Sequence, residues 1–212
     1  AGFPYEEFGQ ELIDDRGLYS QEAVTDNIYE EEIGSIFQIL ARERRCSPVI
    51  VGEAHIGKRE LILALSRALE RERLAGDQPR QLRYPDQVLP PQGFRYTNLL
   101  QLNLTRLLVS GQMMGGAEQF LHSLFEQLEA YPTTLLYLED IHILKSSNRG
   151  GGMDVLDLLL LGLEQRGLQC ICTTTPSGYT QAIERSEGVA RSVVRYTLEP
   201  LSGARLGSVG GR

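Results

Sequence analysis

The sequence predicts an α/β fold of three layers, with a mostly parallel sheet between two layers of helices. Short apolar runs typical of buried strands lie at residues 47–52, 98–102, 134–138, 168–174 and 193–198. Segments with apolar residues at helical spacing alternate with these runs, at residues 58–74, 116–129 and 154–166. Strands that alternate with helices favour parallel pairing, because each crossover helix then covers one face of the sheet.

The composition excludes several classes of partner. The chain has 212 residues, of which 42% are hydrophobic, and this predicts one main domain. A net charge of -7 disfavours a general electrostatic grip on nucleic acid or anionic lipid, so we expect protein or small-molecule partners. No run approaches the ~18 apolar residues of a membrane helix, and the N-terminus does not resemble a signal peptide. We therefore expect no nucleic acid, no membrane and a cytoplasmic location.

The segments outside the strand and helix pattern divide the chain. Residues 1–25 predict an irregular N-terminal arm, since no apolar period is sustained there. A helix is expected to begin at Asp26 or Asn27 and to end near Arg45, with three glutamates in its first turn. Residues 75–98, with four prolines, predict a long loop, residues 145–154 a second one, and residues 201–212 a flexible glycine-rich tail.

Two further features have structural explanations. The three cysteines Cys46, Cys170 and Cys172 lack the spacing of a metal site, so we expect buried thiols, the last two on one face of a strand. Residues 157–163, "DLLLLGL", are apolar on nearly every side of a helix. That helix is either wedged between the sheet and another element, which we favour, or in contact with a neighbouring subunit.

The stretch "GEAHIGKR", residues 52–59, is most of a phosphate-binding loop. In such loops the backbone N–H groups cradle phosphates, a lysine meets the outer phosphates, and a Ser or Thr hydroxyl binds Mg²⁺. Gly52, Gly57 and Lys58 occupy three of the four positions that define such a loop, but Arg59 occupies the position of the hydroxyl. The candidate nucleotide-binding residues are Gly52, Glu53, His55, Ile56, Gly57, Lys58 and Arg59.

An acid pair follows the third predicted strand, in "LLYLEDIH" at residues 135–142. In phosphate-loop ATPases one acid at this place anchors magnesium and the next orients or deprotonates the attacking water. Glu139 and Asp140 are therefore candidate catalytic residues, and either could hold Mg²⁺ if the ion binds. A solvated acidic turn after a core strand is the structural alternative.

From about Thr25 to Pro200 the chain resembles the first ATPase domain of Clp-type AAA+ unfoldases. The resemblance rests on five segments, in this order: "SPVIVGEAHIGKRELILALSRAL", "LLQLNLTRLLVSGQMMGGAEQFLHSLFEQL", "LLYLEDIH", "GGGMDVLDLLLLGLEQRGLQCICTTTPSGYTQAIERS" and "VRYTLEP". It implies an α/β three-layer P-loop (AAA+) fold over residues 26–200, with a five-stranded parallel sheet of order 5-1-4-3-2. The helical lid of that family is not expected within the twelve residues after Pro200.

The resemblance also implies roles for individual residues. Lys58 would contact the β- and γ-phosphates of ATP or ADP, and Thr174 or Thr175 would sense the γ-phosphate. Arg191 would be an arginine finger that reaches the nucleotide of a neighbouring subunit. The pore loop would contain Met113 and Met114.

Five positions depart from the family pattern. Arg59 replaces the magnesium ligand, which makes Mg²⁺ doubtful, and the acids read Glu139–Asp140 in reversed order. Ile28 stands where a glycine lets the adenine base approach, Met114 replaces the pore tyrosine, and Arg191 stands alone where paired arginines are common. These departures predict that ATP hydrolysis is weak or absent.

Three functions remain open from the sequence. We favour a degenerate Clp-type AAA+ module that is a structural or regulatory part of a protein-remodelling oligomer or of a larger parent chain. The first alternative is an active AAA+ ATPase that drives protein unfolding or disaggregation. The second is a monomeric adaptor that binds a partner through the 75–98 loop and the N-terminal arm.

Overall fold

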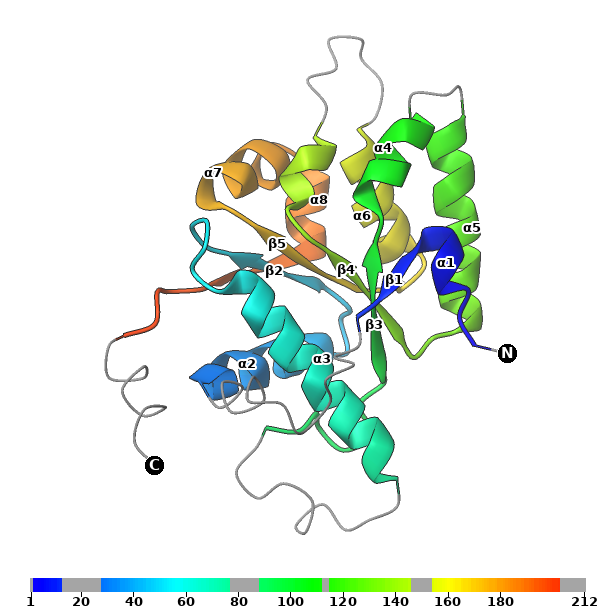
Figure 1. Cartoon of the computed structure of the whole chain (residues 1–212). Helices are drawn as coiled ribbons and strands as arrows, with labels where there is room; N and C mark the ends of the chain where they lie inside the picture. Colours follow the sequence, from blue (N-terminus) through cyan, green and yellow to red (C-terminus); the bar gives the residue numbers. More distant parts are fainter. Residues whose placement is uncertain (1, 13–27, 77–87, 112–114, 146–153, 203–212) are drawn as a thin grey trace.

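The computed structural model describes residues 2–12, 28–76, 88–111, 115–145 and 154–202, and Figure 1 shows their arrangement. Five parallel strands form the body of the sheet: β2 (Ser47–Val51), β3 (Asn98–Leu102), β4 (Thr134–Leu138), β5 (Cys170–Thr174) and β6 (Val193–Thr197). They are arranged in the order β3-β4-β5-β2-β6. If the five parallel strands are numbered 1 to 5 in chain order and read from the β6 edge, this order is 5-1-4-3-2. The predicted order of the parallel strands is thus confirmed.

A sixth strand corrects the predicted five-stranded, wholly parallel sheet. Strand β1 (Gly9–Glu11) follows the short helix α1 (Tyr5–Phe8) and pairs antiparallel with β3. Residues 2–12 are therefore not the irregular arm that we predicted. The pairing requires a glycine at position 9, because any Cβ there would collide with the carbonyl oxygen of Gln101.

Helices cover both faces of the sheet, as predicted (Figure 1). On one face lie α2 (Glu30–Leu40) and α3 (Lys58–Ala75), packed on inward residues such as Ile50 and Tyr137. On the other lie α4 (Leu104–Gly111), α5 (Gly116–Ala130), α6 (Val155–Gln165) and α8 (Glu187–Ser192), packed on residues such as Leu136. Alternate residues of each buried strand thus face opposite cores, as the period of two requires.

Short helical segments join these elements. They are the 3-10 turn η4 (Ile141–Leu144), helix α7 (Pro176–Tyr179) and the π-helical segment η5 (Thr180–Glu184). Helix α2 is shorter than predicted: it begins at Glu30, with Tyr29 at its N-cap, and ends at Leu40. The N-caps that we predicted, Asp26 and Asn27, lie outside the described residues.

The apolar helix and two of the cysteines lie where we expected them. Helix α6 packs on the same face of the sheet as helices α5 and α8 and contacts both, with Leu156, Leu159, Leu160 and Leu163 buried. Cys170 and Cys172 are buried on one face of β5, with their sulfur atoms 3.5 Å apart, and burial raises the pKa of the Cys172 thiol. Cys46 is only half-buried, because it lies in the turn before β2. Among the described residues, no helix combines the length and apolar character needed to cross a membrane.

Candidate nucleotide site

The carboxyl ends of β2, β4 and β5 meet at a cavity of about 640 Å³. Most of the phosphate-loop residues, the acid pair and threonines at the end of β5 lie together there. The lining residues are Ala54, His55, Ile56, Gly57, Lys58, Arg59, Glu60, Glu139, Asp140, His142, Thr173 and Thr175. Ligands of open parallel sheets bind at this end of the strands, so the cavity is the candidate nucleotide site.

The loop between β2 and α3 has the backbone shape of an anion cradle. Gly57 adopts a left-handed conformation (φ 107°), and so does His55 (φ 63°). A side chain at Gly57 would collide with the hydroxyl of Tyr29, and one at Gly52 with Ile56. Helix α3 begins at Lys58 without a side-chain cap, so its first N–H groups are available to a ligand.

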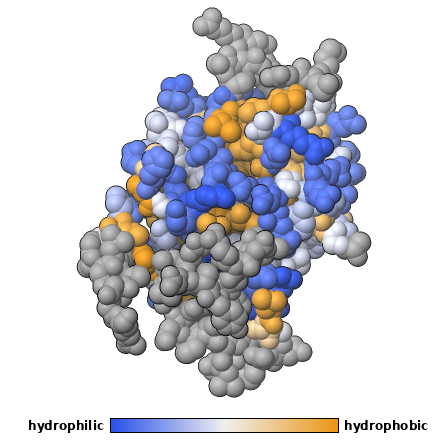
Figure 2. Space-filling view, viewed as in Figure 1, coloured by the Kyte–Doolittle hydropathy of each residue, from blue (hydrophilic) through white to orange (hydrophobic). Residues whose placement is uncertain are grey.

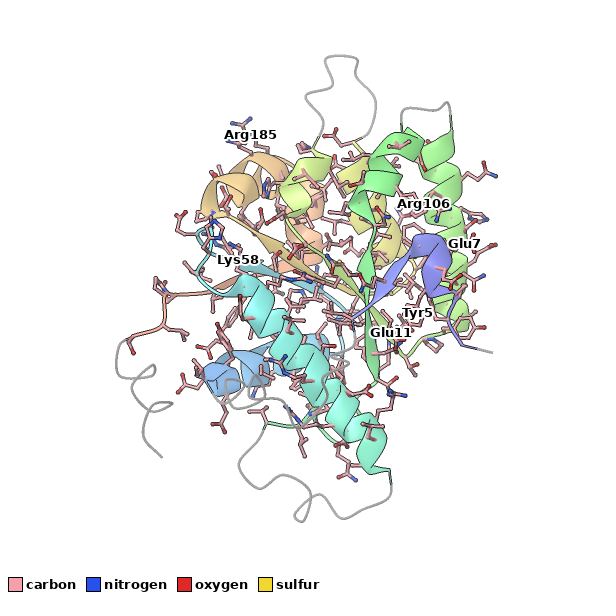
Figure 3. All side chains as sticks on the ribbon, in the orientation of Figure 1. Tyr5, Glu7, Glu11, Lys58, Arg106 and Arg185 are labelled. Atoms are coloured by element: carbon pink, nitrogen blue, oxygen red, sulfur yellow. The ribbon has the colours of Figure 1, made fainter. Side chains whose placement is uncertain are left out.

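Lys58 lies folded over the loop from which it emerges (Figure 3). Its Nζ donates hydrogen bonds to the carbonyl oxygens of Gly52, at 2.6 Å, and Glu53, at 2.7 Å. Burial lowers the pKa of the Lys58 ammonium, and the charges of Asp140 and Glu53 oppose that shift. A phosphate would offer this ammonium a charged acceptor in place of two neutral ones, which is the stronger interaction.

Arg59 makes the most informative contact of the site. Its guanidinium donates to Glu139 Oε1 at 3.0 Å, which makes a salt bridge across the cavity wall. Glu139 also accepts from the hydroxyl of Tyr137, at 3.1 Å, and from Nε2 of Gln101, at 3.3 Å. The carboxylate that would face magnesium is therefore already held by a cation and two neutral donors.

Tyr137 and Gln101 were missed by our reading of the motifs. Each is a polar residue within an otherwise apolar strand, "TLLYL" and "NLLQL", and that pattern was a usable signal. Burial, followed by the negative charge of Glu139, raises the pKa of the Tyr137 phenol, which therefore remains a hydrogen-bond donor. Both side chains fix the position of Glu139 beside Arg59.

Asp140 is placed differently from Glu139. It has a left-handed backbone (φ 51°), and its N–H donates to the hydroxyl of Thr173 at 3.2 Å. Its side chain is exposed at the cavity, with no salt bridge to another described residue. The Asp140 carboxylate is thus an exposed acid of this site that is not held by Arg59.

The two threonines at the end of β5, Thr174 and Thr175, make different contacts. Thr174 is fully buried, and its hydroxyl lies 2.9 Å from Nδ1 of His142. Thr175 caps helix α7 by accepting from the N–H of Gly178, at 3.1 Å, and lines the cavity. Thr174 and Thr175 were the two residues predicted at the sensor position, and of these only Thr175 borders the cavity. Thr173, which was not predicted, borders the cavity too.

Other predicted functional residues lie away from the cavity or outside the described chain. Arg191, on α8, has a side chain that is 72% exposed and pairs with Glu187 one turn earlier. Ile28 is half-buried and packs against the core beneath α2 and α3. The pore-loop residues Met113 and Met114 lie outside the described residues.

The residues at the cavity fit the phosphate groups of a nucleotide. They do not fit a magnesium ion that is coordinated directly by a side chain of the loop. The first turn of α3, Lys58 and Arg59 supply N–H groups and two positive charges for an anion. An inner-sphere magnesium ion would need the hydroxyl that Arg59 replaces, and a Glu139 carboxylate that Arg59 already occupies. The described part of the chain contains no group of three or more acidic, His or Cys residues that could hold a metal ion.

Comparisons with known proteins agree with the fold and the motifs. No protein-family model matches the chain. It is 27% identical over 187 residues, 88% of its length, to the "Chaperone protein ClpB 2" of Parasynechococcus marenigrum, of which it spans 19%. It also resembles Hsp104 structures: the S. cerevisiae Hsp104–ADP complex has a TM-score of 0.65 and 22% identity, over 85% of this chain and 28% of Hsp104. A closed-state reconstruction of Hsp104 with ATPγS and FITC-casein has a TM-score of 0.68 and 22% identity. The match covers 96% of this chain and 32% of the Hsp104 chain.

Proposed function

Since the chain is related to the Clp-type AAA+ ATPases and has their α/β fold, we propose that it is a nucleotide-binding module with weak or absent hydrolysis. In this proposal it is a structural or regulatory part of a protein-remodelling assembly of the cytoplasm. The chain spans about a fifth of the length of its curated relatives. The assembly and its substrates are therefore part of the proposal.

The Arg59–Glu139 salt bridge carries the proposal. It puts a fixed positive charge where the family has a hydroxyl that binds magnesium, at the side of the cavity that would face the outer phosphates. A guanidinium can neutralise phosphate charge and donate several hydrogen bonds, so Arg59 supports phosphate binding without a metal ion. We propose that ATP and ADP bind here and that magnesium adds little to their affinity.

The same contact weakens catalysis. Glu139 is held by Arg59, Tyr137 and Gln101, and this leaves Asp140 to act on the attacking water. Aspartate is one methylene shorter than the glutamate that the resemblance implies at this position. A displacement of that size costs on the order of a hundredfold in a reaction that depends on positioning. Nucleotide would thus be bound and hydrolysed slowly or not at all.

The partners are proposed from the relatives. One similar structure is described as a complex of Hsp104 with ATPγS and FITC-casein, and the first relatives are named as chaperones. We infer that this chain also works beside protein partners, in an AAA+ type oligomer or within a longer chain. Arg191 supports the oligomer, since its side chain is exposed on α8 and does not line the cavity of its own chain.

Calorimetric titration with ATP, in magnesium and in EDTA, tests the proposal. The unaltered protein should bind ATP equally well in both buffers. Arg59→Thr restores the missing hydroxyl and releases Glu139, so its affinity should rise at least about tenfold with magnesium. Lys58→Ala, which removes the phosphate-contacting ammonium, should lose binding in both buffers.

An active ATPase is the second candidate, because the exposed carboxylate of Asp140 lies at the same cavity as Lys58 and its charge acts on the Lys58 ammonium. Steady-state phosphate release separates the two candidates. Fast turnover by the unaltered protein that Asp140→Asn abolishes would establish the active ATPase. Turnover at the background level, with ATP binding retained, supports the degenerate module.

A further inference from the structure

A cluster of arginines lies at the amino ends of the strands, on the edge of the sheet opposite the nucleotide site. Arg45 lies two residues before β2, Arg95 precedes β3, and Arg42 follows α2. We call the cavity that these three residues line the arginine pocket. Its basic character contrasts with the net charge of -7 of the whole chain.

The arginine pocket has a volume of about 260 Å³ and continues into a smaller cavity of about 200 Å³. Arg45, Arg95 and Gln169 line both, so the two cavities meet at these side chains. Together they have room for two or three side chains of a ligand. The site is therefore a local pocket and not an extended basic surface.

Among the described residues, none that lines the larger cavity carries a carboxylate. Its lining residues are Leu40, Ala41, Arg42, Arg45, Pro91, Gln92, Gly93, Phe94, Arg95 and Gln169. The acid of the smaller cavity, Glu129, forms a salt bridge of 3.1 Å with Arg166. Within the described part of the chain, Arg42, Arg45 and Arg95 form no salt bridge with a carboxylate, so their charges are available to an external anion.

Rigid neighbours hold the pocket in shape. Arg45 donates to the carbonyl oxygen of Gly167 at 2.7 Å. The buried side chain of Gln169 accepts from the hydroxyl of Tyr96, at 2.7 Å, and donates to the carbonyl of Cys46, at 2.9 Å. The Arg45 guanidinium is thus held in place beside a hydrogen-bonded floor, which lowers the entropy cost of binding.

Phe94 gives the pocket an apolar wall. Its ring packs edge-on against Phe37, with centroids 5.1 Å apart, and against Tyr96, at 5.7 Å. Burial raises the pKa of the Tyr96 phenol, and the charges of Arg95 and Arg45 oppose this shift, so both guanidiniums act on the floor of the pocket. An apolar wall beside unpaired arginines suits a carboxylate on a short aliphatic stem.

We propose that the arginine pocket binds an acidic segment of a partner protein, with its Asp or Glu carboxylates on Arg42, Arg45 and Arg95. Guanidinium groups bind carboxylates through paired, charge-assisted hydrogen bonds. A nucleic acid would need a longer basic surface and would be repelled by the acidic remainder of the chain. Because the pocket and the nucleotide site lie at opposite edges of the sheet, both ligands can bind together.

Fluorescence anisotropy with a labelled oligoglutamate peptide tests this site. The unaltered protein should bind oligoglutamate at low salt and an oligoserine peptide much more weakly. Its affinity for oligoglutamate should fall as the salt concentration rises, because salt screens the charges. The double variant Arg42→Glu/Arg95→Glu should bind oligoglutamate at least about tenfold more weakly, because two attractive charges become repulsive. Its ATP affinity should stay unchanged, which shows that it is folded and separates this inference from the nucleotide proposal.

The matched control is Arg185→Glu. Arg185 (labelled in Figure 3) is an exposed arginine between η5 and α8, with no salt bridge to another described residue. It lines neither of the two cavities that meet at the arginine pocket. This control should bind oligoglutamate nearly as well as the unaltered protein. The proposal is overturned if oligoglutamate does not bind at low salt, if the double variant binds it undiminished, or if Arg185→Glu weakens it equally.

Discussion

At the scale of single residues, Arg59 changes the side-chain chemistry of a loop whose backbone has the shape of an anion cradle. The turn from Gly52 to Lys58 needs two glycines and an uncapped helix start, and all three are present. Main-chain groups of this shape suit a phosphate, and they do not depend on residue 59. A guanidinium in place of a hydroxyl therefore leaves the shape of the loop intact and offers no oxygen to a metal ion.

Gly57 allows a residue-scale prediction. Gly57→Ala should lower the free energy of unfolding by roughly 2–4 kcal/mol, because a left-handed alanine is strained and its Cβ collides with the Tyr29 hydroxyl. Gly93→Ala is the control for backbone strain alone: Gly93 is also left-handed (φ 74°), but its Cβ would meet nothing within 4 Å. Its cost should stay near 1 kcal/mol.

Urea denaturation of Gly57→Ala, alone and combined with Tyr29→Phe, measures the collision. Removal of the Tyr29 hydroxyl should recover part of the lost stability in the double variant, since the two changes act at one contact. Equal losses in Gly57→Ala and Gly93→Ala would contradict the role given to Tyr29.

The sequence predicted many of the residues that line the cavity. It did not predict the contacts that their side chains make. Lys58, Glu139 and Thr175 were placed by their positions after strands, and strand ends converge in a parallel sheet. The Arg59–Glu139 salt bridge could not be read in this way, because it depends on side chains from α3 and from the end of β4. The burial of Thr174 behind His142 depends likewise on the local turn.

At the scale of elements, long periodic segments were predicted well and short ones were missed. The five parallel strands and helices α3, α5 and α6 carry enough apolar residues to show their period. Strand β1 has three residues and helix α7 four, too few for a period to be read. Such elements are stabilised by contacts distant in sequence, such as β1 with β3.

Two helical glycines give an element-scale prediction. Gly34 in α2 has open space where a Cβ would be, whereas a Cβ at Gly162 in α6 would lie 2.6 Å from the ring of Phe125. Gly34→Ala should raise the free energy of unfolding by about 0.5–1 kcal/mol through helix propensity. Gly162→Ala gains the same propensity but overpacks the α5–α6 contact, so it should lower that free energy by about 1–2 kcal/mol.

Thermal or urea unfolding of these two variants measures the difference. Opposite signs would show that close packing of α6 against α5 requires the glycine. If Gly162→Ala were as stabilising as Gly34→Ala, the contact between Phe125 and α6 would have to be looser than its geometry indicates.

At the scale of the whole molecule, the sheet separates two charged sites. The nucleotide cavity lies at the carboxyl ends of the strands and the arginine pocket at their amino ends. In the view of Figure 2, hydrophobic residues also reach the surface among polar ones, and the exposed apolar side chains include Val109 on α4 and Ile143 on η4. A chain that spans a fifth of its curated relatives thus presents several surfaces on which further chain or further subunits can act.

Arg191 provides the prediction that belongs to this scale. Its salt bridge with Glu187 is exposed and lies within one helix, so it contributes little and is easily exchanged for a phosphate. If Arg191 contacts the nucleotide bound to a neighbouring subunit, ATP should promote self-association of the unaltered protein in sedimentation velocity. The variant Arg191→Ala should stay monomeric in the presence of ATP.

The control Arg185→Ala, which removes a nearby exposed charge, should assemble normally. Dilute Arg191→Ala should bind ATP as well as the unaltered protein, because the residue is remote from its own cavity. A loss of ATP affinity in that dilute variant would instead place Arg191 in its own subunit's site and contradict the shared arrangement.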